Sequence, residues 1–171
     1  MGMSRGKVIK AAKKTATRTV PKAKAAKAKT PAPRVVTQTK VVTKTVEVDR
    51  NRALRALAQR IIDVTVANDD DATLALYAEN IESKEANNPA SVGLEAIKQK
   101  FAMWRGMVSD ATFTPRSVVV DGNTIMIEWE GRVTLAASGR VAEMNEIAVH
   151  EIANGRIVKE RFFYDPSVLQ G

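Results

Sequence analysis

Two residues of the chain, His150 and Glu146, have side chains suited to moving protons, and their spacing puts them on one face of a predicted strand. His150 is the only histidine of the chain, and an imidazole can accept or donate a proton near neutral pH. Alternate side chains of a strand point to one face, so both residues, at even positions of a predicted strand over 139–152, share a face. A carboxyl group and an imidazole in one pocket could act as acid and base. A half-exposed strand histidine without a chemical role is the alternative, and both stay open.

The other glutamates of the predicted strands are expected to face water. Glu128 and Glu130 alternate with apolar residues, so they point away from the core. We expect them to pair with Arg132 and Arg140. The three aspartates at 69–71 lack the alternating spacing of a calcium loop, so we interpret them as a helix cap.

Composition excludes several classes of site. The chain has no cysteine and one histidine, which excludes a thiolate nucleophile and a site built from several cysteines or histidines. No glycine-rich phosphate loop occurs, so nucleotide binding has no support. We expect neither a metal nor a cofactor. No apolar run reaches the roughly 18 residues of a membrane span.

Hydrophobic spacing predicts helices first and strands last. The predicted helices run from Asp49 to about Ala67, through Leu74, Leu76 and Tyr77, and from Leu94 to about Arg105. A loop with a short strand is expected between Ile81 and Val92. The predicted strands cover 110–120, 124–136, 139–152 and 156–165, with turn signals at 121–123, 137–139 and 154–155. This order indicates an α+β domain with helices on one face of a curved antiparallel sheet.

Three segments resemble signatures of the nuclear-transport-factor-2-like superfamily and, within it, the SnoaL-like proteins related to polyketide cyclases and ketosteroid isomerases. They are Leu76–Asn80 (LYAEN), Gly93–Ile97 (GLEAI) and His150–Arg161 (HEIANGRIVKER) running to Asp165 and Pro166. The resemblance covers about residues 50–167. It implies a cone-shaped α+β fold around an apolar pocket, and it includes enzymes as well as proteins without chemistry.

The resemblance also suggests site residues. A ketosteroid isomerase would place its base in the segment that holds Glu82 and Glu85, and SnoaL-like cyclases use a histidine and an aspartate in the last two strands, for which His150 and Asp165 are the nearest candidates. Epoxide hydrolases of this fold need an aspartate where this chain has Phe162, which argues against that activity. The aromatic residues expected to line the pocket are Tyr77, Phe101, Trp104, Trp129 and Phe163.

The first 46 residues differ sharply from the rest in charge. They hold 13 of the 27 lysines and arginines and no acidic residue, whereas residues 47–171 hold 14 basic and 19 acidic residues, a net charge of −5. We expect residues 1–48 to form a disordered tail and linker, with 35–48 extended or an edge strand, and residues 49–171 to form the domain. The basic side chains expected to contact a polyanion are Lys7, Lys10, Lys13, Lys14, Arg18, Lys22, Lys24, Lys27, Lys29 and Arg34.

Two functions stay open at this point. In the first, slightly favoured because no catalytic set of the family is complete, a non-catalytic small-molecule pocket or dimerisation domain is tethered to nucleic acid or another polyanion by its tail. In the second, the domain is an isomerase, dehydratase or cyclase that uses a pocket carboxylate and His150. We expect a homodimer, a small apolar ligand and a cytoplasmic location, with nucleoid association, a solubilising tail or an organelle transit peptide as further interpretations of the tail.

Overall fold

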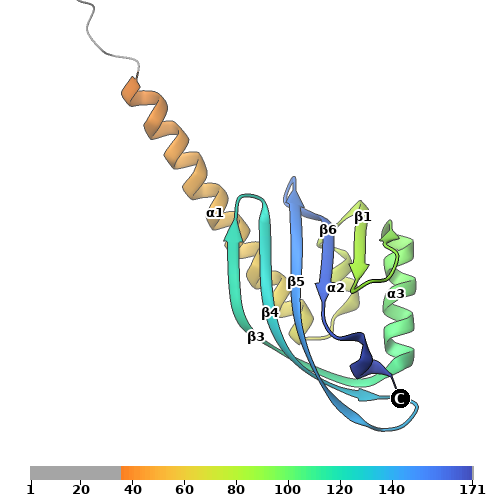
Figure 1. Ribbon diagram of the computed structural model, residues 1–171. Helices are drawn as coiled ribbons and strands as arrows, with labels where there is room; N and C mark the ends of the chain where they lie inside the picture. Colours follow the sequence, from red (N-terminus) through yellow and green to blue (C-terminus); the bar gives the residue numbers. More distant parts are fainter. Residues whose placement is uncertain (1–35, 171) are drawn as a thin grey trace, which may run out of the picture. The chain divides into compact units, whose positions relative to one another are not determined.

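The computed structural model describes residues 36–170, with side chains described from residue 47 onward. Helices come first and most of the strands last (Figure 1). In chain order, the elements are α1 (Val36–Val66), α2 (Asp70–Leu74), β1 (Tyr77–Glu85), β2 (Ser91–Val92), α3 (Leu94–Met107), β3 (Val108–Asp121), β4 (Thr124–Leu135), β5 (Val141–Ala153), β6 (Arg156–Phe163) and the 3₁₀ helix η1 (Pro166–Leu169). The ten basic tail residues predicted to contact a polyanion lie outside the described residues.

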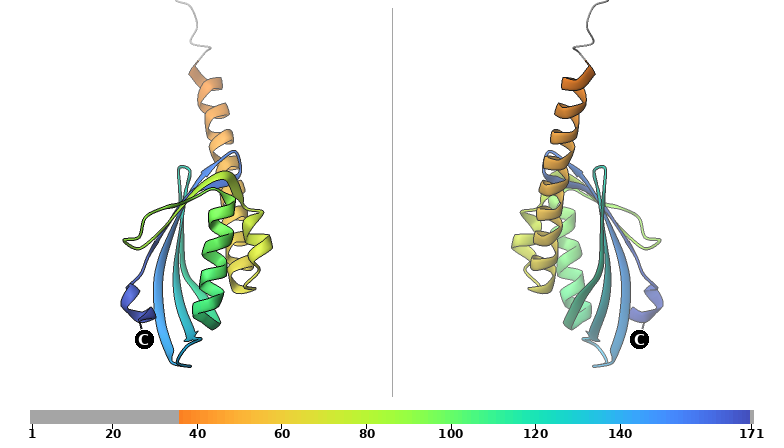
Figure 2. Two further views of the ribbon diagram at one scale, coloured as in Figure 1. Left: turned by 90° about the vertical axis from the view of Figure 1, so that its right-hand side faces the viewer. Right: turned by 90° about the vertical axis from the view of Figure 1, so that its left-hand side faces the viewer.

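The six strands form one curved sheet in the order β2-β1-β6-β5-β4-β3. Strands β3 to β6 form the antiparallel meander that the turn signals predicted. The sheet differs from the expected antiparallel one at one pairing, because β1 pairs in parallel with β6. Helix α3 and the strands β3 to β5 lie between β1 and β6 in the sequence. The last strand, β6, then lies beside β1 and runs in the same direction. The result is a mixed sheet with the helices on one face (Figure 2).

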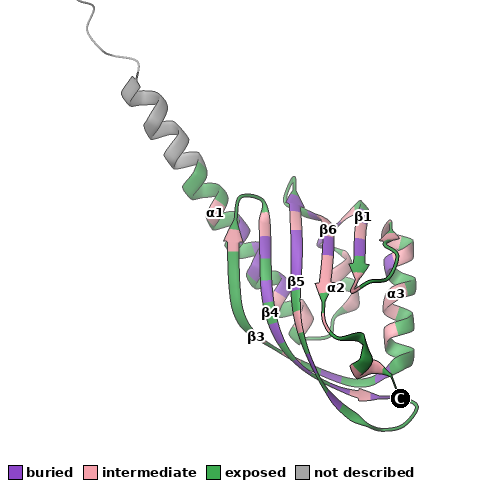
Figure 3. Cartoon of the chain, in the orientation of Figure 1, coloured by how far each residue is buried: buried purple, intermediate pink, exposed green. Residues whose placement is uncertain are grey.

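Residues of β4 alternate between the core and water as their spacing predicted. Ile125, Ile127 and Trp129 are buried, whereas Glu128 and Glu130 are exposed. Their predicted arginine partners are wrong, because Glu130 pairs with Arg116 and Glu128 accepts a hydrogen bond from Ser117. Figure 3 shows buried residues running along β4 and β5, which form the centre of the core.

Helix α1 contributes a buried stripe to this core. Leu54, Leu57, Ala58 and Ile61 fall at helical spacing and are each less than 10% exposed. The helix begins at Val36, so the extended linker or edge strand predicted for residues 35–48 is wrong for the described residues of that segment, 36–48. Its β-branched residues lower helix propensity by only tenths of a kcal/mol each, and a helix that is already nucleated by packing extends easily.

The segment between α1 and α3 contains more strand than its sequence predicted. Asp69 caps α2 by accepting a hydrogen bond from the Ala72 amide, as predicted. The helix then ends at Leu74, and Tyr77 starts β1 instead of continuing a helix. Strand β1 runs to Glu85 through a stretch expected to be mostly loop, and the Gly93 amide donates to the Ile81 carbonyl where β2 leads into α3.

Within residues 36–170, none of the helices combines the length and the apolar composition that a membrane span requires. The same part of the chain contains no group of three or more histidine, cysteine, aspartate or glutamate side chains placed to hold a metal ion.

Candidate active site

A cavity of about 430 Å³ lies between the helices and the sheet. Aromatic side chains form much of its wall, and Phe113 packs edge-on against Trp129 with ring centroids 6.2 Å apart. Four of the five aromatic residues predicted for the pocket line it: Tyr77, Phe101, Trp104 and Trp129. A cavity of this size and composition suits a small, mostly apolar molecule.

The carboxylate of Glu160 is the most enclosed polar group of the site. The side chain of Glu160 is fully buried on β6. One oxygen, Oε2, accepts a hydrogen bond of 2.9 Å from the Tyr77 hydroxyl, and the other, Oε1, accepts one of 2.7 Å from Ser83. Ser83, Glu160 and His150 are the buried polar side chains among the described residues. The Glu160 carboxylate can be buried because both of its oxygens accept hydrogen bonds.

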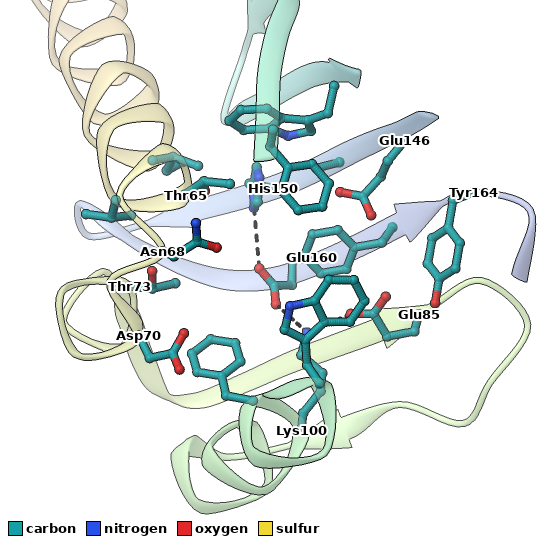
Figure 4. A pocket seen from close by; sticks show the side chains of 18 of the residues that line it. Thr65, Asn68, Asp70, Thr73, Glu85, Lys100, Glu146, His150, Glu160 and Tyr164 are labelled. Carbon is teal, nitrogen blue, oxygen red and sulfur yellow. Dashed lines mark hydrogen bonds and ion pairs between the residues drawn. The ribbon is translucent and has the colours of Figure 1, made fainter. Parts of the chain in front are cut away.

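Lys100 of α3 reaches into this cluster from the helical side (Figure 4). Its ammonium donates hydrogen bonds to Ser83 Oγ at 2.7 Å, Glu85 Oε1 at 2.8 Å and Glu160 Oε1 at 3.2 Å. It also lies 4.6 Å from the centre of the Phe162 ring, a favourable cation–π distance. Burial disfavours its charge, but the two carboxylates raise the pKa of Lys100 above its ordinary value.

His150 stands on β5 directly opposite Glu160 on β6. Its Nδ1 lies 3.5 Å from Glu160 Oε2, and its ring meets Phe162 edge-on at 6.2 Å. Neither ring nitrogen has a full hydrogen bond within the described part of the chain. The ring also contributes to the cavity wall. His150 is therefore held between a buried carboxylate and the space where a ligand would lie.

Two carboxyl groups of the cavity have pKa values moved in opposite directions. Burial alone would raise the pKa of Glu160, but His150, Lys100 and Ser83 lower it to about 2. For Glu146 the balance is reversed: burial raises its pKa to about 8, the negative charges of Glu85 and Glu160 raise it further, and Lys100 lowers it only in part. At neutral pH Glu160 is thus an anion and Glu146 carries a proton, the division of roles that acid–base chemistry uses.

Glu146, Glu85 and Tyr164 form one end of the cavity (Figure 4). Burial and the two neighbouring carboxyl groups raise the pKa of Tyr164 to about 12. The hydroxyl therefore keeps its proton over the physiological range. Leu169 of η1 also lines the cavity, and Arg140 fixes this last segment by donating to the Val168 and Gln170 carbonyls.

A sequence profile of the SnoaL-like domain matches residues 58–160, more than half of the chain. The chain belongs to the SnoaL-like family. None of the curated proteins matches it in sequence.

Solved structures share the NTF2-like fold with this SnoaL-like chain. An NTF2-like protein of unknown function from Burkholderia pseudomallei aligns with a TM-score of 0.64 at 15% identity, over 70% of this chain and 98% of its own. A protein from Jannaschia sp. named as a SnoaL-like polyketide cyclase gives 0.63 at 15% identity, over 71% and 94%. Another of that name, from Mesorhizobium loti, gives 0.57 at 26% identity, over 65% and 98%.

The SnoaL-like domain brings together only some of the residues predicted for its site. His150, Glu146 and Glu85 all line the cavity. Glu82 instead forms an ion pair with Lys159 at 2.9 Å and is not part of the cavity wall. Asp165 caps η1 by accepting a hydrogen bond from the Ser167 amide, which lowers its pKa, and its side chain is exposed.

One aromatic residue also lies elsewhere than predicted. Phe163 is 52% exposed and stays outside the cavity, whereas its neighbour Phe162 lines it. The carboxylate that faces His150 across the last two strands is Glu160, in place of Asp165. Glu160, Lys100 and Ser83 were absent from the predicted set. A signal for Lys100 existed, since it lies between Ile97 and Trp104 on the apolar stripe of its helix.

Proposed function

We propose that this SnoaL-like domain binds a small, mostly apolar carbonyl compound in its cavity and catalyses proton transfer on it. The observation that carries the proposal is the position of His150, between the buried Glu160 carboxylate and a cavity that also holds a protonated Glu146. Loss of a proton beside a carbonyl is the first step of isomerisations, dehydrations and cyclisations alike. The polyketide cyclase name of the two relatives supports this class of reaction.

His150 is the proposed base. Glu160 is ionised, so its oxygens only accept hydrogen bonds. The favourable arrangement therefore places the imidazole proton on Nδ1, which faces Glu160 at 3.5 Å. Nε2 then keeps its lone pair and can take a proton from a bound ligand, and the buried carboxylate stabilises the imidazolium that forms.

Glu146 is the proposed acid. Because burial raises its pKa to about 8, it can donate a hydrogen bond at neutral pH to a ligand carbonyl. The same bond strengthens when removal of the proton leaves negative charge on that oxygen. His150 would thus remove the proton from the carbon beside the carbonyl, and Glu146 would donate a hydrogen bond to the oxygen of the enolate that forms.

A ligand screen followed by a proton-exchange assay tests this function. Apolar ketones that raise the melting temperature are incubated in heavy water, and NMR follows deuterium uptake beside the carbonyl. We expect His150→Gln to lower the exchange rate by about 100-fold or more and Glu146→Gln by about 10- to 100-fold. Glu143→Gln, an exposed glutamate of the same strand, is the matched control. Exchange that is unaffected by His150→Gln would overturn the proposal.

Binding without turnover is the second candidate. It is supported by the Glu160 network, in which the Lys100 ammonium binds Ser83, Glu85 and Glu160, as in a structural ion pair. In that case ligands would stabilise the domain, and none would exchange protons faster than in buffer.

We further propose that the basic tail binds a polyanion such as nucleic acid. The support is charge alone: 13 basic and no acidic residues in positions 1–46. The association constant for duplex DNA should fall by about 0.9 log units per phosphate contact for each tenfold rise in salt concentration. Binding should show little sequence preference. A variant with the ten predicted tail residues changed to glutamine should lose this binding. Equal binding by both proteins would contradict the assignment to the tail.

We also propose a homodimer formed through the outer face of the sheet. Val119, Met126 and Val149 align across β3, β4 and β5, and the pair Ile147–Phe163 extends this row onto β6. Four of these five side chains are at least 39% exposed, with Val149 as the exception. A second copy of the chain would cover such an apolar band.

A further inference from the structure

Lys100 is connected to the proposed base, His150, through the carboxylate of Glu160. It reaches Glu160 Oε1 at 3.2 Å, while His150 faces the other oxygen, Oε2, at 3.5 Å. Ser83 links the two partners, because its hydroxyl accepts from the Lys100 ammonium and donates to Glu160. A change of charge on Lys100 would therefore reach His150 through one carboxylate.

The positive charge of Lys100 balances the buried negative charge of Glu160. Glu160 is fully enclosed and Lys100 is the one permanent cation that touches it among the described residues. The remaining contacts come from neutral hydroxyls, Tyr77 and Ser83. Glu85, also bound to Lys100, has a partly exposed side chain and can be solvated. A buried carboxylate without a cation takes up a proton or draws one onto a neighbour.

We propose that Lys100 is a positioning residue that keeps His150 neutral with its proton on Nδ1, by holding Glu160 as an anion. This inference rests on the proposed role of His150 as a base. With Lys100 in place, Glu160 needs no second positive charge, so the imidazole stays neutral and its Nε2 lone pair stays free. Without the ammonium, two outcomes are open to the pair: His150 becomes an imidazolium, or Glu160 is protonated and donates to Nδ1. Both put a proton on Nε2 and remove the base.

The chain is well suited to the measurement, because it contains a single histidine. Nitrogen-15 NMR of histidine-labelled full-length protein therefore reports Nδ1 and Nε2 of His150 without assignment. At pH 7 we expect an unprotonated Nε2 in the wild type and a protonated Nε2 in Lys100→Met. Lys98→Met, which removes an exposed lysine of the same helix paired only with Glu95, should leave the spectrum unchanged. Glu85→Gln should also leave Nε2 unprotonated, since Glu160 keeps its cation.

Two further variants keep the test decisive. Lys100→Gln retains hydrogen-bond donors without the charge, so it should give the same protonated Nε2 if charge is what matters. Should Lys100→Met fail to fold, Ser83→Ala weakens the same link and should protonate part of the Nε2 population. With an identified substrate, we expect Lys100→Gln to lower kcat about 100-fold with less than about a 2-fold change in KM.

The outcomes separate this inference from the function on which it rests. An unprotonated Nε2 in the wild type, Lys100→Gln and Ser83→Ala alike would overturn the role of Lys100 and leave His150 as a base. A protonated Nε2 in the wild type at pH 7 would overturn the proposed base, and the role of Lys100 with it.

Discussion

His150 and Glu160 face each other across β5 and β6 because a β-bulge aligns them. Next to the turn, Ile152 pairs with Ile157, but the following pair is Glu151 with Lys159. Val158 is therefore an extra residue in β6. If β6 kept Val158 but paired regularly with β5, Lys159 would stand opposite His150, and Glu160 would point to the outer face of the sheet. The bulge at Val158 thus aligns the pair on which the proposed chemistry depends.

Replacing the buried Glu160 carboxylate should remove a stabilisation that the wild type has at neutral pH and loses in acid. Because the folded pKa of Glu160 is about 2 against an ordinary value of 4.5, its contribution is present above pH 4.5 and is lost as pH falls toward 2. It amounts to about 3 kcal/mol at neutral pH. Urea unfolding of Glu160→Gln at pH 7 should show a loss of about 3 kcal/mol or more, since Lys100 also loses a partner.

The comparison at low pH distinguishes this effect from a general packing defect. At pH 2.5 the difference in free energy of unfolding between Glu160→Gln and wild type should be clearly smaller than at pH 7. Glu151→Gln, a partly exposed glutamate of β5, should cost less than about 1 kcal/mol at either pH. A difference for Glu160→Gln that is equal at the two pH values would contradict the assignment.

Glu146 should have the opposite effect on the pH dependence of stability. Its pKa is raised from 4.5 to about 8 in the folded chain, so the native state holds the proton longer than the unfolded state does. Stability therefore falls as pH rises from about 4.5 to 8, by no more than about 4 kcal/mol, and less where cavity water solvates the carboxylate. Melting curves should show Glu146→Gln close to wild type at pH 5 and more stable at pH 9. A variant that tracks wild type at both values would contradict the raised pKa.

Gly131 should tolerate no side chain, because two neighbouring strands crowd its α-carbon. A β-carbon there would collide with the Met144 carbonyl oxygen and lie 2.7 Å from the Phe113 ring. We expect Gly131→Ala to lower the free energy of unfolding by about 1–3 kcal/mol. Gly106→Ala in α3 meets nothing within 4 Å and should stabilise by about 0.5–1 kcal/mol. Equal effects of the two substitutions in urea unfolding would be inconsistent with this packing.

A charge on the apolar band of the outer sheet face should prevent the proposed dimer. Phe163 is 52% exposed and pairs with Ile147, itself 43% exposed. Light scattering coupled to size exclusion should give a dimer mass for the wild type and a monomer mass for Phe163→Glu. Val141→Glu, at an exposed valine that begins β5 and lies away from the Ile147–Phe163 pair, should remain dimeric. A monomeric wild type, or a dimeric Phe163→Glu, would reject this interface.

The sequence was sufficient for the meander and for part of the site. Turn residues and alternation located β3 to β6. Alternation within β5 placed Glu146 on the same face as His150, because the pairing of β5 with β4 is regular between the two residues. The bulge at Val158 has no signature in the sequence. Counting alternate residues from Ile157 puts Phe163 inside and Glu160 outside, the reverse of what is observed.

Tertiary contacts explain the other differences. Residues 77–85 became a strand because β6 lies beside them in parallel, a pairing between segments about 80 residues apart that local propensity does not reveal. Lys100 could not be predicted as a site residue from its type alone, because a helical lysine normally faces water. Its buried place follows from the carboxylates of β1 and β6, which only the fold brings beneath α3.

Both tryptophans of the chain, Trp104 and Trp129, lie in the cavity wall. The tryptophan fluorescence of the protein therefore originates entirely from the surface that a ligand would touch. A molecule that enters the cavity contacts these indoles and changes their emission. The domain thus carries its own optical reporter, and a compound collection can be titrated against it without a label or a tag, before any substrate has been identified.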